Sequence, residues 1–134
     1  PVKGFLIAAP HSGSGKTIVT LGLLKALKDK GARVASAKAG PDYIDPAFHA
    51  AATGRDCVNL DPWAMRAAQL RALALDAGTD ADVLVVEGMM GLFDGAADGK
   101  GSSADLAALL GLPVVLVVDC ARQSHSVAAL GRSG

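Results

Sequence analysis

The chain has 134 residues, enough for one domain with a buried core but short for a complete nucleotide-driven enzyme. Its 13 basic and 13 acidic side chains give a formal net charge of zero, which argues against a surface for nucleic acid or another polyanion. Hydrophobic residues make up 51% of the sequence and aromatic residues only 4%, so the interior must be built from Ala, Val and Leu, as is common in parallel sheets covered by helices.

Four apolar runs have the length and composition of buried strands, at about 4–9, 33–37, 83–86 and 113–119. Helical patterns separate these runs: 16–30, a short segment from Asp45 to a stop at Gly54, a longer one from Asp61 to Gly78, and one from Ser102 or Ser103 through Leu110. Strands that alternate with helices predict an α/β fold with a mostly parallel sheet and right-handed crossovers.

The stretch from Pro10 to Thr17 has the properties of a loop that binds nucleotide phosphates. It reads Pro-His-Ser-Gly-Ser-Gly-Lys-Thr and lies between a strand pattern and a helix pattern, although Pro10 replaces the first glycine of the usual motif. Glycines let backbone N–H groups face phosphate oxygens, Lys16 adds a positive charge, and the Thr17 hydroxyl would reach Mg²⁺. We therefore predict nucleoside triphosphate binding by Ser12, Gly13, Ser14, Gly15, Lys16 and Thr17.

Charged residues follow the other predicted strands, at the edge of the sheet where ligands of parallel sheets bind. Glu87 closes the third apolar run, where a nucleotide-binding sheet usually carries an acid that reaches Mg²⁺. Lys38 and Asp42 follow the second run, and Asp94 lies in a glycine-flanked loop after Glu87. Each also has a plainer interpretation: a solvated side chain for Lys38 and Glu87, a turn for Asp42 and Asp94, and a helix cap for Asp45.

The histidines and cysteines are given no role in the predicted site. His11 is interpreted as a spacer in the loop, and His49 and His125 as ordinary helix residues. Cys57 and Cys120 are too few and too irregularly spaced for a metal motif or a disulfide framework, and we interpret them as free thiols in a reducing cytoplasm. No run approaches the ~18 apolar residues that span a bilayer, so we predict a soluble cytoplasmic protein without a membrane partner.

Five motifs spread over nearly the whole chain are shared with a known family. They are Ser-Gly-Ser-Gly-Lys-Thr at 12–17, Lys-Ala-Gly-Pro-Asp-Tyr-Ile-Asp-Pro at 38–46, Asn-Leu-Asp at 59–61, Glu-Gly-Met-Met-Gly-Leu-Phe-Asp-Gly at 87–95 and Ala-Asp-Leu-Ala at 104–107. Together they strongly resemble the cobyrinic acid a,c-diamide synthase family, which belongs to the P-loop group of dethiobiotin synthetase and the partitioning ATPases. The second motif is far more selective than the phosphate loop.

The resemblance implies an ATP-dependent carbon-nitrogen ligase of cobalamin biosynthesis. Such an amidoligase converts the a and c carboxylates of cobyrinic or hydrogenobyrinic acid, both tetrapyrrole polycarboxylates, into carboxamides. ATP would phosphorylate a carboxylate, and ammonia derived from glutamine would then displace the phosphate. Carried over by motif, the metal ligands would be Thr17, Asp42 and Glu87, and the catalytic residues Lys38, Tyr43, Asp45 and Asp94.

Three alternatives stay open at this point. The acceptor could be nickel-sirohydrochlorin, since its synthase shares every motif. A partitioning-type ATPase switch would carry a second lysine near the start of the loop, where this chain has Pro10-His11-Ser12. Dethiobiotin synthetase is not expected to contain Gly-Pro-Asp-Tyr-Ile-Asp-Pro.

The resemblance also predicts the domain organisation. Residues 1–134 would form the N-terminal portion of a P-loop NTPase-like synthetase domain, an incomplete domain on its own. Relatives continue into a glutaminase domain that releases ammonia from glutamine, and neither Cys57 nor Cys120 lies in a nucleophile-like context. We therefore expect the glutaminase domain to be absent from this chain and the chain alone to be inactive. A homodimer is compatible with the resemblance.

Overall fold

The computed structural model describes residues 3–10, 15–40, 45–89, 91–92 and 102–118. Within them, strands and helices alternate along the chain: β1 (Gly4–Ala8), α1 (Lys16–Asp29), β2 (Val34–Ala39), α2 (Asp45–Thr53), β3 (Val58–Leu60), α3 (Ala67–Gly78), β4 (Val83–Glu87), α4 (Ser103–Leu110) and β5 (Val114–Leu116). The described strands form one sheet in the order β3-β2-β4-β1-β5, and every pairing is parallel. The predicted α/β class is confirmed.

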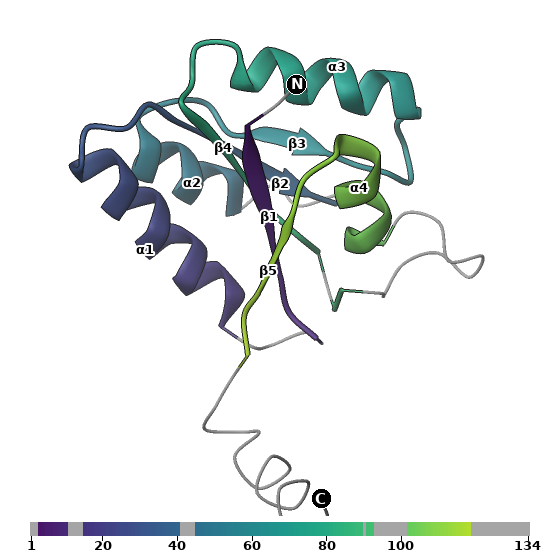
Figure 1. The fold of residues 1–134 in the computed structure, drawn as a ribbon, viewed down its shortest axis with the longest axis horizontal. Helices are drawn as coiled ribbons and strands as arrows, with labels where there is room; N and C mark the ends of the chain where they lie inside the picture. Colours follow the sequence, from purple (N-terminus) through teal and green to yellow (C-terminus); the bar gives the residue numbers. More distant parts are fainter. Residues whose placement is uncertain (1–2, 11–14, 41–44, 90, 93–101, 119–134) are drawn as a thin grey trace, which may run out of the picture.

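The helices cover the sheet on both faces, with α1 and α2 on one side and α3 and α4 on the other (Figure 1). Because side chains alternate along a strand, neighbouring residues serve different layers. Leu6 and Val86 join the larger apolar cluster, which also holds Leu70 of α3 and Leu106 of α4. Ile7, Val34 and Val85 pack instead with Leu24 of α1. None of the described helices is both long and apolar enough to cross a bilayer.

Two helix boundaries follow the predicted signals. Helix α2 ends at Thr53, and Gly54 adopts a left-handed φ of 76° directly after it. Helix α4 begins after Ser102, whose hydroxyl accepts a hydrogen bond from the backbone N–H of Asp105 while the Asp105 carboxylate receives the backbone N–H of Ser102. This reciprocal capping box fixes the direction in which α4 leaves the site.

The third predicted helix begins six residues later than expected, at Ala67 rather than Asp61. Asp61 does accept backbone hydrogen bonds, from Trp63 at 3.0 Å and Ala64 at 3.3 Å, but these close a turn. Arg66 is then extended, with φ −75° and ψ 158°, so the turn cannot continue into the helix. The sequence predicted that Asp61 caps a helix, whereas the hydrogen bonds to its carboxylate stabilise a local turn.

Two strand predictions also need correction. Strand β3, with only three residues, was not predicted, because so short a run shows no periodicity; it pairs with Ala37, Lys38 and Ala39 of β2. The run 113–119 was expected to be buried, but Val114, Val115 and Leu116 are 40–47% exposed. Strand β5 lies at the end of the sheet, where β1 is its one partner strand among the described residues.

Candidate functional site

Strand register brings Lys38 and Glu87 together. The two residues are opposite partners in the β2–β4 ladder, so their side chains leave the sheet on the same face. Lys38 is 5% exposed and Glu87 fully buried, and the Lys38 ammonium lies 2.5 Å from Oε2 of Glu87. It also donates to the backbone carbonyl of Gly88 at 3.3 Å. The interpretation of these two residues as solvated is therefore wrong, and Lys38 lies within β2 rather than after the strand.

Helix α1 contributes the hydroxyl of Thr17 to the site. Gly15 precedes the helix in a left-handed conformation with φ 74°, which glycine adopts without strain, and it offers no side chain to cap the helix. The hydroxyl of Thr17, in the first turn, donates a 3.2 Å hydrogen bond to Oε2 of Glu87. The end of the phosphate loop and the end of β4 thus meet directly.

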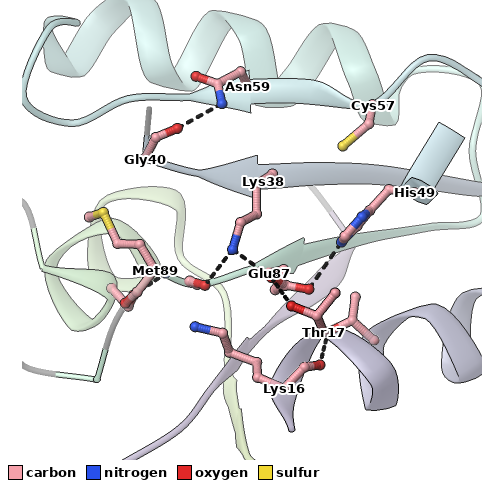
Figure 2. Close-up of polar contacts among 12 residues, drawn as sticks. Lys16, Thr17, Lys38, Gly40, His49, Cys57, Asn59, Glu87 and Met89 are labelled. Carbon is pink, nitrogen blue, oxygen red and sulfur yellow. Dashed lines mark hydrogen bonds and ion pairs between the residues drawn. The ribbon is translucent and has the colours of Figure 1, made fainter. Parts of the chain in front are cut away.

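His49 is the functional candidate that sequence reasoning missed. It was assigned to an ordinary helix position, yet its side chain is fully buried and Nε2 lies 3.1 Å from Oε1 of Glu87. Figure 2 shows His49 and Thr17 approaching Glu87 from two helices, while Lys38 reaches it from the neighbouring strand. A weak signal was present: His49 follows Asp45 by four residues, the spacing of one helix face, just after the motif at 38–46.

The electrostatics of Glu87 are set by these neighbours. Burial alone would raise the pKa of the carboxyl group, but hydrogen bonds from His49 and Lys38, together with the charge of Lys38, outweigh burial and lower the pKa from 4.5 to about 2. Glu87 is therefore a carboxylate at neutral pH. An ionised carboxylate only accepts hydrogen bonds, so Nε2 of His49 must carry a proton.

The chain after β4 is held against both β1 and α4. The N–H of Gly88 donates to the carbonyl of Ile7 at 2.7 Å, and the Ser103 hydroxyl bridges the N–H and carbonyl of Met89 at 2.9 Å and 3.0 Å. A Cβ at Gly88 would lie 2.7 Å from Oγ of Ser103 and 3.0 Å from the Ile7 carbonyl oxygen. Only glycine fits this approach, which places the end of β4 against the first strand.

The described part of the site fits Mg²⁺. The ion prefers oxygen ligands and usually keeps several waters, needing only one or two protein carboxylates beside nucleotide phosphates. Glu87 offers an ionised carboxylate and Thr17 a hydroxyl oxygen, which lie 3.2 Å apart. No group of three or more His, Cys, Asp or Glu side chains that could hold a metal occurs among the residues that the structure describes.

Several predicted residues cannot be located. Ser12, Gly13, Ser14, Asp42, Tyr43 and Asp94 lie outside the described residues, as do His11, Cys120 and His125. Asp45 begins α2, but its side chain is not described. Cys57 is a half-buried free thiol, and burial raises its pKa, which agrees with its interpretation as unreactive.

A mostly apolar cavity of about 340 Å³ lies on the other face of the sheet, between α3 and α4. Its lining consists of Pro62, Met65, Ala67, Leu70, Asp105, Leu106 and Leu109. Asp105 is its charged member, and that carboxylate already takes part in the capping box of α4. The cavity shares no residue with the Lys38–Glu87 cluster, so the chemistry of the candidate site does not depend on it.

Comparison with known proteins gives a consistent picture. Residues 5–133 match the family described as the CobQ/CobB/MinD/ParA nucleotide binding domain. The chain is 72% identical over 130 residues to a hydrogenobyrinate a,c-diamide synthase of Brucella suis biovar 1 (strain 1330). Proteins of the same name from Rhizobium meliloti (strain 1021) and Rhodobacter capsulatus are 67% identical over 129 residues and 59% over 131 residues. These matches cover 95–96% of the chain, which spans 30% of the length of each relative.

Proposed function

The chain belongs to the CobQ/CobB/MinD/ParA nucleotide binding domain family, and from this premise we propose that it binds Mg·ATP for an a,c-diamide synthase. The observation that carries the proposal is the hydrogen bond from Thr17 to the buried carboxylate of Glu87. It joins the residue after the loop lysine to the acid at the end of β4, the two groups from which P-loop proteins hold a nucleotide's metal ion. Mg²⁺ would supply charge neutralisation at the β- and γ-phosphates.

Phosphate binding, metal binding and charge stabilisation are assigned to different residues according to their position. Backbone N–H groups at the start of α1, together with Lys16, bind and orient the phosphates. Thr17 and Glu87 supply oxygen ligands for the metal, and we include Asp42 from the sequence motif. Lys38 brings a positive charge to the carboxyl edge of the sheet, next to Glu87 and 3.3 Å from the Gly88 carbonyl. Such a charge stabilises a transferring phosphoryl group, because phosphoryl transfer depends on positioning and charge neutralisation.

We propose hydrogenobyrinate as the acceptor. The relatives at 59–72% identity carry that name, which favours this tetrapyrrole over cobyrinic acid and nickel-sirohydrochlorin. A carboxylate is a poor electrophile, so the reaction would pass through an acyl phosphate that ammonia attacks, with phosphate as the leaving group. Tyr43, Asp45 and Asp94 would face the acceptor, and a separate glutaminase domain would supply the ammonia, in a cytoplasmic enzyme.

The competing function is a nucleotide-dependent switch of the partitioning type, since the family name includes such proteins. The loop of this chain has no lysine at 10–12, where those ATPases carry their second lysine, and the high identity to synthases favours amidation.

The experiment is a turnover assay of the complete natural protein with ATP, Mg²⁺, ammonia and hydrogenobyrinate, beside the Lys16→Ala variant. We expect one ADP for each amide formed, and therefore two for each a,c-diamide, and we expect both products to fall at least about tenfold in Lys16→Ala, because a charge-assisted phosphate contact is lost. ATP hydrolysis that is independent of the tetrapyrrole, with no amide formed, would favour the switch.

A further inference from the structure

We propose that His49 is a positioning residue, which fixes the Glu87 carboxylate so that Oε2 faces Thr17 and the metal–nucleotide site. This inference rests on the proposed function, because it assigns His49 a role through the acid that we expect to bind Mg²⁺. His49 does not itself face the phosphate loop: Figure 2 places it on the side of Glu87 away from Lys16, where it comes from α2.

The two oxygens of Glu87 have different partners. Oε2 accepts hydrogen bonds from Thr17 at 3.2 Å and from Lys38 at 2.5 Å, whereas Oε1 accepts the N–H of His49 at 3.1 Å. A carboxylate held at one oxygen can still turn about its terminal carbon–carbon bond, since that torsion has a broad energy profile. A donor on the second oxygen removes this freedom. Because the two oxygens are chemically equivalent, His49 sets the plane of the carboxylate and thus the direction in which the other oxygen faces Thr17.

The imidazole is itself held in place by its surroundings. Its side chain is fully buried, so packing limits its movement. The hydroxyl of Thr53, one turn further along α2, donates a 3.2 Å hydrogen bond to the backbone carbonyl of His49 and not to the imidazole. The exposed residue beside it is Phe48, with 56% of its surface accessible. Helix α2 thus turns a polar residue inward and an aromatic residue outward, which reverses the usual preference and agrees with a specific task for His49.

A residue that hydrogen-bonds to a metal-binding carboxylate, and so orients it, affects metal affinity without contacting the ion. Loss of such a partner typically costs about 10–100-fold in metal affinity or activity. If His49 only filled space, its replacement would change stability but not the affinity of the folded protein for metal and nucleotide. The two roles can be separated by metal binding, which does not require turnover.

The test compares His49→Gln with His49→Asn in the complete natural protein. The amide nitrogen of Gln stands three bonds from Cβ, as Nε2 of histidine does, and can donate to Oε1; the amide of Asn is one bond shorter and cannot reach it. Thr53→Val is the matched control, because it removes a buried hydroxyl from the same helix without touching Glu87. Bound Mn²⁺ is measured by electron paramagnetic resonance in the presence of ATP, at a temperature where thermal unfolding shows every variant to be folded.

We expect His49→Gln and Thr53→Val to bind Mn²⁺ with ATP nearly as the wild type does, and His49→Asn to bind it about 10–100-fold more weakly. Equal affinity in His49→Asn and wild type would overturn the positioning role, as would equal losses in His49→Gln and His49→Asn. A wild type that binds no Mn²⁺ with ATP would instead refute the proposed function, and the inference with it. If His49→Asn does not fold, His49→Met takes its place, because Met has a similar length but no donor for Oε1, and it should show the same loss of about 10–100-fold.

Discussion

Replacing Lys38 by Met removes the cation of the buried pair while keeping most of the side-chain volume. The Glu87 carboxylate would stay fully buried, and of the partners described above it would retain only Thr17 and His49. Breaking a buried ion pair at one end typically costs 3–5 kcal/mol, because the remaining charge is left without compensation. We therefore expect Lys38→Met to destabilise the fold strongly at neutral pH.

The pKa of Glu87 gives the pH dependence of this loss. Its pKa is 4.5 without the protein environment and about 2 in the fold, and this difference corresponds to about 3 kcal/mol. Because the folded-state pKa is the lower one, the stabilisation is complete above pH 4.5 and is lost as the pH falls towards 2. Without Lys38 the pKa of Glu87 should rise, since burial then dominates. Protonation of Glu87 would remove the uncompensated buried charge and so reduce the destabilisation of the variant. The difference in stability between wild type and Lys38→Met should therefore be largest at neutral pH and shrink as the pH approaches 2.

The measurement is urea denaturation of the 134-residue chain, followed by fluorescence of Trp63, its one tryptophan. The double variant Lys38→Met/Glu87→Gln is the control: with both charges gone, it should lie closer to the wild type than Lys38→Met does. A loss below about 1 kcal/mol in Lys38→Met, unchanged between pH 7 and pH 3, would refute the reasoning.

Two further predictions concern the end of β4 and the loop after it. Glu87→Gln should lower turnover by about 2–4 kcal/mol of transition-state stabilisation and shift the Mg²⁺ requirement, whereas Asp94→Asn should lower kcat for amidation and leave Mg·ATP affinity nearly intact. Steady-state kinetics with varied Mg²⁺, ATP and tetrapyrrole test both, and the opposite pattern would reverse the two roles. Gly88→Ala should destabilise the protein by about 1–3 kcal/mol, because the new Cβ would lie 2.7 Å from Oγ of Ser103. Gly22→Ala, where the new Cβ would meet no atom within 4 Å beyond its neighbours and the nearby backbone of α1, should instead stabilise α1 by roughly 0.5–1 kcal/mol in thermal unfolding. Similar effects at both glycines would contradict the packing argument.

The sequence predicted those parts of the fold that depend on local pattern. The apolar runs before Glu87 and before the phosphate loop are long enough to identify strands β1 and β4, and the spacing of apolar residues identified α1. Lys38 and Glu87 were selected because ligands bind at the carboxyl ends of parallel strands. Their direct contact could not be predicted, since it depends on β2 and β4 being neighbours in a register that pairs residue 38 with residue 87.

The failures come from competition between local interactions and tertiary packing. Asp61 has the residue type of a helix cap, but the turn that it closes is followed by an extended Arg66, and only the backbone conformation there decides between turn and helix. His49 has no motif of its own, because its role arises where α2 crosses the end of β4. Strand β3 exists through pairing with β2 rather than through its own three residues.

The Lys38–Glu87 pair links the chemistry to the strand register. Side chains alternate along β2, so a slip by one residue against β4 would turn Lys38 toward the opposite face. There Ala37 and Ala39 pack in the apolar cluster with Leu60, Leu70 and Leu84. Burying an ammonium group among such side chains costs several kcal/mol, more than the roughly 1 kcal/mol net value of one ladder hydrogen bond. The charge pair therefore favours the one register in which the acid at the end of β4 also meets Thr17 and the phosphate loop.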